Sequence, residues 1–277
     1  MKKIFSKPVG LLFVGALSAT LAFAAGGRAL ADDFDGKLHV GLTPYVWLPT
    51  FNGNLNFTLP SAPNSTIGAT VGPNSYLSNL NFAFMVAGEV RKGKLSLTGD
   101  IINLNLSSDR TSVRSFSGPG GEVVVPLQFD GSTRLTGTLV TVGAGYTLLH
   151  CSNSNLDAFA GARYAGMSAG VGWNLTGPAG TFPRMGNVSR SLGLTDGIVG
   201  LRGKFGLGDG GFFIPYYADV GTGATQLTYQ GILGAGFGFG WGNLQVVWRH
   251  LSYDMGTSGA LDNVRLDGPA LGATFKI

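Results

Sequence analysis

The sequence has one cysteine, three histidines and few charged residues, which make up 12% of its 277 positions. Because Cys151 has no second cysteine to pair with, a disulfide framework and a cysteine-based metal site are both excluded. The one long apolar run, 9–25, stands near the start of the chain, and no later run is long enough for a spanning helix. A chain with a positive mean hydropathy of +0.23 must then place its apolar side chains by alternation along strands.

Residues 1–31 have the three parts of a secretory signal peptide: a basic start, the apolar run and the small-x-small site Ala29-Leu30-Ala31. The alternative is a membrane-anchor helix, but the apolar run is short for a span and the cleavage site follows directly. Four of the 19 Lys and Arg residues lie in this leader, which leaves 15 against 15 Asp and Glu and a mature net charge of zero. The basic pI therefore belongs to the leader, and a nucleic-acid partner is not expected.

The mature chain, 32–277, is predicted to be a single outer-membrane β-barrel, all-β, closed and antiparallel. Apolar and polar or small residues alternate over ten segments of suitable length; eight or twelve strands remain open, because strand boundaries read from one sequence err by a few residues. The ten segments are 37–48, 80–91, 95–101, 140–148, 157–164, 196–207, 213–220, 227–239, 244–253 and 268–277.

The connections between these segments differ by end, as in barrels with short periplasmic turns and long extracellular loops. Short connections are expected at 92–94, 149–155, 208–210 and 241–243. Long loops are expected at 49–78, 107–132 and 173–191, the first with a short strand extension at 55–59. After Ile101 the parity of the third strand switches, because Ile102, Leu104 and Leu106 are the apolar residues there, which suggests a bulge or an extracellular extension.

The last segment alternates up to the final residue, with Leu271, Ala273, Phe275 and Ile277 on one face. Its spacing Gly272-x-x-Phe275-x-Ile277 resembles the C-terminal signal by which Gram-negative outer-membrane barrels are handed to the assembly machinery, although Ile277 replaces the usual terminal aromatic. The resemblance implies the barrel-assembly machinery as a partner. A closing strand must also pair with the first strand, because an open sheet edge is not tolerated in lipid.

Six further segments stand out in the mature chain: 44–49 (PYVWLP), 89–93 (EVRKG), 161–164 (GARY), 196–202 (DGIVGLR), 217–221 (YADVG) and 249–254 (RHLSYD). In this order they resemble a group of largely uncharacterised Gram-negative outer-membrane β-barrel proteins described as porin-like. The resemblance spans most of the mature chain and implies fold and outer-membrane location, without a substrate. Directly before the last segment that group often has Tyr, where this chain has Trp248.

Ten charged residues fall on inward-facing positions of the predicted strands. Mixed signs in a narrow lumen favour a self-neutralising network that stabilises and blocks the barrel, over a selectivity ring of one sign. The network is predicted to comprise Glu89, Arg91, Asp100, Arg163, Asp196, Arg202, Asp219 and Arg249; Asp157 and Lys204 are the other two inward charges.

His250 and Ser252 lie two residues apart, so they share a face, and by parity it is the lipid face. A His-x-Ser pair there resembles the outer-membrane lipid A deacylases, in which serine needs an adjacent histidine as base. Those enzymes have Asn after the Ser, where this chain has Tyr253, and no acidic orienting residue can be identified from the sequence. The alternative interpretation, two polar side chains at the outer interface, is favoured.

Other motifs predict no chemistry. The segment 206–211 fits Gly-x-Gly-x-x-Gly but lies between two strands and opens no helix, so dinucleotide binding is excluded. His39 and His150 are isolated, and no cofactor and no metal are expected. Tyr45, Trp47, Trp241 and Trp248 are interpreted as an aromatic girdle at the membrane interfaces.

The expected role is that of an integral outer-membrane barrel, structural or porin-like, with a narrow charge-plugged lumen and no catalysis. Outer-membrane lipid is an expected partner, and whether a small solute also binds or passes is left open by the sequence. One alternative is a lipid-modifying hydrolase that uses His250 and Ser252. Another is a surface adhesion or interaction protein that acts through its extracellular loops.

Overall fold

The structure is a computed structural model that describes residues 34–59, 62–117, 124–151, 153–176, 184–208, 210–256 and 261–277. The predicted leader lies outside the described residues. Among those residues, no helix is long and apolar enough to cross a membrane. The elements are β1 (Leu38–Trp47), β2 (Thr50–Leu59), β3 (Ala62–Val71), α1 (Pro73–Tyr76), a 3-10 turn (Leu77–Asn79), β4 (Leu80–Lys92), β5 (Leu95–Ser117), β6 (Val124–Cys151), β7 (Ser154–Thr176), β8 (Arg184–Leu207), β9 (Phe212–Gly223), β10 (Leu227–Phe239), β11 (Gly242–Asp254) and β12 (Leu261–Lys276).

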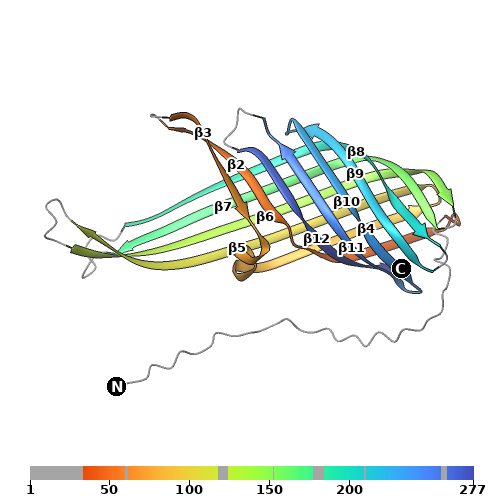
Figure 1. Ribbon diagram of the computed structural model, residues 1–277, viewed down its shortest axis with the longest axis horizontal. Coiled ribbons are helices and arrows are strands. Elements are labelled where there is room, and N and C mark those ends of the chain that lie inside the picture. Colours follow the sequence, from red (N-terminus) through yellow and green to blue (C-terminus); the bar gives the residue numbers. More distant parts are fainter. Residues whose placement is uncertain are drawn as a thin grey trace, which may run out of the picture.

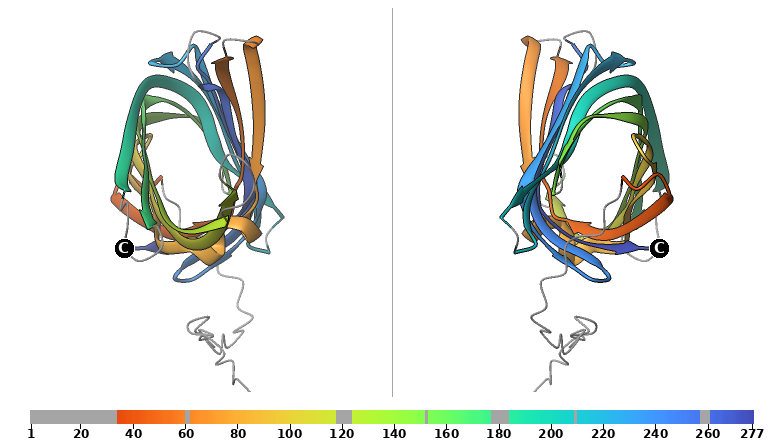
Figure 2. Two further views of the ribbon diagram at one scale, coloured as in Figure 1. Left: turned by 90° about the vertical axis from the view of Figure 1, so that its left-hand side faces the viewer. Right: turned by 90° about the vertical axis from the view of Figure 1, so that its right-hand side faces the viewer.

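Ten of these strands close into an antiparallel barrel (Figures 1 and 2). From β4 to β12 each strand pairs with its neighbour in the chain, and β1 lies between β4 and β12. The closing pair runs from Gly41 opposite Lys276 to Trp47 opposite Ala270. The predicted fold class, strand number and closure of the last strand on the first are thus confirmed.

Beyond the end of β1, the hairpin β2–β3 continues the sheet. β2 pairs with β12, for example Phe51 with Leu266, and β3 pairs with β2. The region 49–78, predicted as a loop with a short strand at 55–59, is therefore mostly two ten-residue strands followed by α1. Figure 1 shows this hairpin rising from the barrel at the end away from the C-terminus.

Strands β5 to β8 extend well past the barrel at that same end, which we call the extended end (Figure 1). β5 stays paired with β6 as far as Ser117 opposite Val124, and β7 with β8 as far as Leu175 opposite Arg184. The long loops predicted at 107–132 and 173–191 were therefore wrong as loops: strand pairing continues through them, leaving only 118–123 and 177–183 outside the described residues. The opposite end, with Phe34 and Ile277, is called the terminal end.

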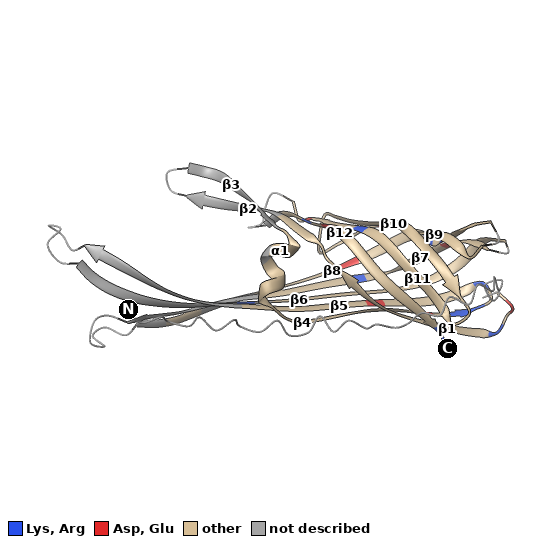
Figure 3. Ribbon diagram, turned by 60° about the horizontal axis from the view of Figure 1, so that its bottom comes forward, with Lys and Arg blue, Asp and Glu red and all other residues tan. Residues whose placement is uncertain are grey.

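The outer face of the barrel is apolar, because every second residue of each strand points away from the lumen. Leu233, Val199, Val246 and Leu271 are among the exposed side chains on it. Figure 3 shows a wall that is mostly free of charged positions, with many of the charges near the terminal end. The predicted outward set of the last strand is confirmed, since Leu271, Phe275 and Ile277 are all exposed.

The inner face changes character along the barrel. Ile102 is buried inside it with Trp47, Met85 and Leu251, and Leu104 packs against them. Of the two predicted explanations for the parity switch, the extension is present, since β5 continues to Ser117. The switch itself is no bulge, because β5 keeps an unbroken register with β6 through this point. It marks instead the place where apolar residues take over the inward positions of β5.

Candidate functional site: the barrel lumen

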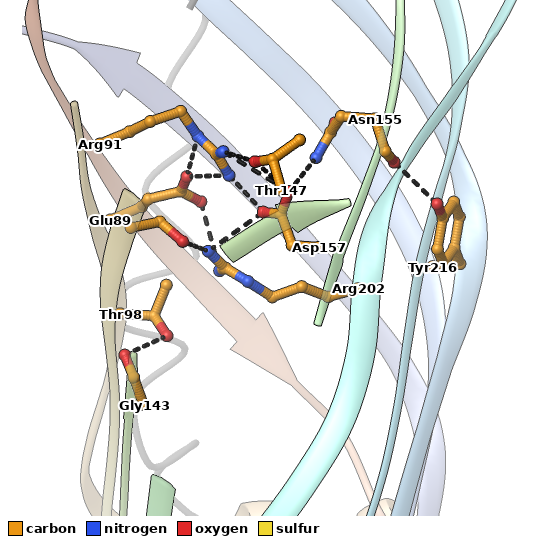
Figure 4. A network of polar contacts seen from close by, with 10 residues as sticks. Glu89, Arg91, Thr98, Gly143, Thr147, Asn155, Asp157, Arg202 and Tyr216 are labelled. Atoms are coloured by element: carbon orange, nitrogen blue, oxygen red, sulfur yellow. Dashed lines mark hydrogen bonds and ion pairs between the residues drawn. The ribbon is translucent and has the colours of Figure 1, made fainter. Parts of the chain in front are cut away.

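Three groups of charged side chains lie inside the barrel. The group nearest the terminal end contains Arg91, whose Nε donates to Glu89 Oε1 at 2.7 Å and whose NH2 pairs with Asp157 (Figure 4). Arg202 reaches the same two carboxylates, at 3.3 Å from Glu89 Oε2 and 3.6 Å from Asp157 Oδ2. Two cations and two carboxylates therefore neutralise one another.

Asp157 is the centre of this first group. Its Oδ1 accepts from Thr147 Oγ1 at 2.7 Å and from Asn155 Nδ2 at 3.1 Å, and its side chain is almost fully buried. A buried carboxylate needs such a set of donors to offset its lost hydration. The sequence placed Asp157 inside the barrel but outside the predicted network, because alternation gives a side chain's face and not its partner.

The second group is built around Arg249 on β11. Its NH2 donates to Asp100 Oδ2 at 2.8 Å and to Gln230 Oε1 at 2.8 Å, and its NH1 donates to the Tyr45 hydroxyl at 3.0 Å. The Trp47 ring lies 4.6 Å from the Arg249 Cζ. The prediction that Tyr45 and Trp47 belong to an aromatic girdle is therefore wrong, because both contact this arginine inside the lumen. Trp241 and Trp248, the other two predicted girdle residues, are exposed on the outer surface.

The third group joins β7, β8 and β9. Arg163 pairs with Asp219, and its NH1 donates to Thr228 Oγ1 at 3.2 Å. Asp196 Oδ1 accepts from the Thr225 backbone N–H at 2.8 Å. The eight residues predicted as one network are therefore all in the lumen, but they form three groups.

Every strand of the barrel contributes one deeply buried inward residue to a band that we call the septum. Each of these ten side chains is 9% exposed or less. The apolar members among them pack into one cluster, and Arg163 pairs with Asp219. The septum comprises Trp47, Met85, Ile102, Thr141, Arg163, Asp196, Asp219, Gln230, Leu251 and Ala270.

Below the septum, on the side of the terminal end, lies a cavity of about 400 Å³ that we call the lower chamber. Thr141, Gln230 and Ala270 of the septum form its inner limit, and Phe34 and Ile277 line it at the terminal end. Near that end, Asp35 Oδ1 lies 2.7 Å from His39 Nε2 and accepts the Lys37 backbone N–H at 2.8 Å. The hydrogen bond to His39, and to a lesser extent the one from Lys37, lowers the pKa of Asp35.

His250 lies on the outer surface of β11, as predicted, and has an acidic neighbour that sequence reasoning missed. Asp267, directly opposite on β12, contacts His250 Nδ1, and the Tyr229 ring stacks on the imidazole at 5.3 Å. Ser252 is deeply buried, and within the described chain no hydrogen bond joins its hydroxyl to His250. A base and an orienting acid are present, but the serine is not engaged with them.

The remaining motifs lie where they carry no chemistry. The glycine segment 206–211 spans the end of β8 and the turn before β9, with positive φ at Gly208 and Gly211. The His150 ring contacts Phe34 at 4.1 Å, and Cys151 is exposed. Among the described residues, no group of three or more His, Cys, Asp or Glu could hold a metal ion.

Comparison with known proteins gives no family: no family model matches the chain, and no curated protein matches it. Solved structures of similar fold include the outer membrane protease OmpT of Escherichia coli, at 11% identity and a TM-score of 0.47, covering 91% of this chain and 100% of that one. The translocator domain of autotransporter NalP of Neisseria meningitidis is similar at 14% identity and 0.35, covering 89% and 90%. Ail of Yersinia pestis is similar at 10% identity and 0.31, covering 87% and 98%. Similarity at these low identities and TM-scores says nothing about activity, so function must be argued from the chain's own residues.

Proposed function

We propose that this chain is an integral outer-membrane β-barrel, exported through the periplasm, with a structural role and a lumen closed to solutes. Its apolar outer surface suits acyl chains, and closure of β1 on β12 leaves no open edge in the barrel. The predicted signal peptide and the alternating pattern of the C-terminal strand support the same outer-membrane location. Outer-membrane lipid and, through β12, the barrel-assembly machinery are the proposed partners.

The proposal that the lumen is closed rests on the septum. Porins leave an aqueous channel because many strands make a wide barrel, whereas a barrel of about eight strands is just wide enough for side chains to fill. With ten strands, this barrel is close to the filled case. No catalytic role is proposed for the charged groups of the lumen, since their members are largely engaged with one another.

Planar-bilayer recording tests this proposal. The purified barrel should insert without discrete conductance steps across a wide voltage range. The variant that lacks only the β2–β3 hairpin, residues 50–71, serves as a control, because it removes extracellular chain and leaves the septum intact. Reproducible single-channel steps from the intact protein would contradict the closed lumen.

A second candidate function is surface interaction, which the extension of β5–β8 favours. β8 pairs with β9 only from Asp196 onward, so its segment 184–195 has no β9 partner on that side. β5 likewise pairs with β4 only up to Leu106. Unpaired strand edges can accept a partner's strand. Unchanged adhesion of cells to host surfaces after deletion of 107–132 would count against this role.

The third candidate is a lipid-modifying hydrolase, and the His250–Asp267 contact favours it specifically. An acid that orients the imidazole is what a serine nucleophile's base requires. The buried Ser252 weighs against it, which is why the structural role is preferred. A comparison of the lipid A acyl composition between wild type and the Ser252→Ala variant tests this candidate. Loss of a deacylation in the variant would support the hydrolase, and an identical composition would exclude it.

A further inference from the structure

We propose that the lower chamber binds a small organic anion with an apolar body, which enters from the terminal end. The inference rests on the septum, because a blind chamber can retain a ligand that an open channel would pass on. It does not depend on the membrane location. Its volume of about 400 Å³ falls in the range of small-molecule sites, about 300–1,000 Å³.

The chamber has one apolar side and one charged side. Phe213, Ile232 and Val247, from β9, β10 and β11, line the first, with Tyr217 beside Phe159 at 5.1 Å between ring centres. The charged group of Glu89, Arg91, Asp157 and Arg202, from β4, β7 and β8, lines the other. A ligand that has both an apolar body and a polar head matches these two surfaces.

Hydrogen-bonding capacity is left over on the chamber's lining. Among the described residues of the lining, two buried donors, Thr141 Oγ1 and Arg202 Nε, and one buried acceptor, Asn243 Oδ1, have no hydrogen-bond partner. Thr141 is nine-tenths buried and lines the chamber. Unpaired buried donors are costly, so an acceptor group placed against them is favoured.

The charge of the lining favours an anion over a cation. Five Lys and Arg side chains line the chamber, against three Asp and Glu side chains and the terminal carboxylate of Ile277. The cations are Arg91, Arg202, Lys204, Arg249 and Lys276. One positive charge in excess on the lining favours a carboxylate over an ammonium group.

Calorimetric titration of the detergent-solubilised barrel with benzoate tests the proposal, with benzylamine as the probe of the same ring and opposite charge. Benzoate should bind at least about tenfold more tightly than benzylamine. Ile232→Trp should abolish benzoate binding by filling the apolar side of the chamber. Leu233→Trp is the matched control, since the next residue of β10 points to the outer surface and should leave binding unchanged.

Folding of each variant is checked by its heat-modifiable migration on gels. Should Ile232→Trp fail to fold, Arg202→Gln replaces it, and benzoate should then lose about tenfold in affinity while benzylamine does not. Equal binding of benzoate to the Ile232→Trp and Leu233→Trp variants would mean partition into the micelle and would overturn the proposal. Equal affinity for benzoate and benzylamine would also overturn it. If the barrel still shows no conductance steps in either case, the proposal of a closed lumen stands although ligand binding has failed.

Discussion

Arg163 on β7 and Asp219 on β9 form an ion pair in which neither side chain has any exposure to solvent. The pair spans β8 between them, where Asp196 is buried beside it with one carboxylate oxygen, Oδ2, that has no partner among the described residues. Arg163 is thus the cation that compensates the buried charge of Asp219. The stability of this part of the septum therefore depends on that pairing.

Removing the arginine should be strongly destabilising. Arg163→Met leaves Asp219 buried without its cation, which costs on the order of 3–5 kcal/mol of unfolding free energy. Urea unfolding of the barrel in lipid vesicles, followed by tryptophan fluorescence, measures this. The double variant Arg163→Met with Asp219→Leu should recover much of the loss, because an apolar pair of similar volume replaces the ion pair. A loss below about 1 kcal/mol for the single variant would mean that water already reaches the site.

The barrel itself could be predicted from the sequence because its two faces differ in chemistry, with apolar side chains outside and packed polar groups over much of the inside. Where both faces of a strand are polar, that signal is absent. Segment 107–117 has the sequence SSDRTSVRSFS, which predicted a loop, yet its backbone pairs with β6 throughout. Alternation also failed at Ile102, because it assumes a polar interior and the septum there is apolar.

The partners within the lumen could not be predicted for a related reason. Arg249 and Asp100 are 149 residues apart in the chain, and their contact depends on strand register and on the barrel's closure. The alternation that placed Arg249 inward says nothing about which carboxylate it meets. The same holds for His250 and Asp267, whose direct opposition follows from the β11–β12 register.

Trp47 should matter to stability far more than Trp248, although both were predicted as girdle residues. The Trp47 indole is buried, lies over Arg249 and donates to the Gly268 carbonyl at 3.2 Å. Trp47→Ala should therefore cost about 3–5 kcal/mol, as for other buried aromatics. Trp248→Ala, at an exposed outer position, should cost clearly less. Unfolding curves of the two variants under the same conditions decide, and equal losses would contradict the lumen role of Trp47.

Gly161 on β7 is required by close backbone packing. A Cβ at this position would lie 2.0 Å from the Val142 carbonyl oxygen and 2.7 Å from the Gly143 Cα. Gly161→Ala should force the strands apart and cost about 1–3 kcal/mol, as overpacking does. Gly137→Ala on β6 is the control, because a Cβ there meets nothing within 4 Å. Similar unfolding free energies for the two variants would show that β6 and β7 can separate freely at Gly161.

A charge placed on the outer surface distinguishes a lipid-facing wall from a water-facing one. Leu233 stands in the middle of β10 with its side chain exposed, whereas Leu227 is the first residue of that strand, at the extended end. In lipid, Leu233→Arg should cost about 2–4 kcal/mol and Leu227→Arg only about 0–1, because the cost of an arginine falls from midplane to interface. Folding free energies in vesicles measure both. On a surface that faces water the two arginines would cost alike, within about 0.5 kcal/mol. The depth dependence therefore tests the membrane location with two variants of one strand, independently of anything in the lumen.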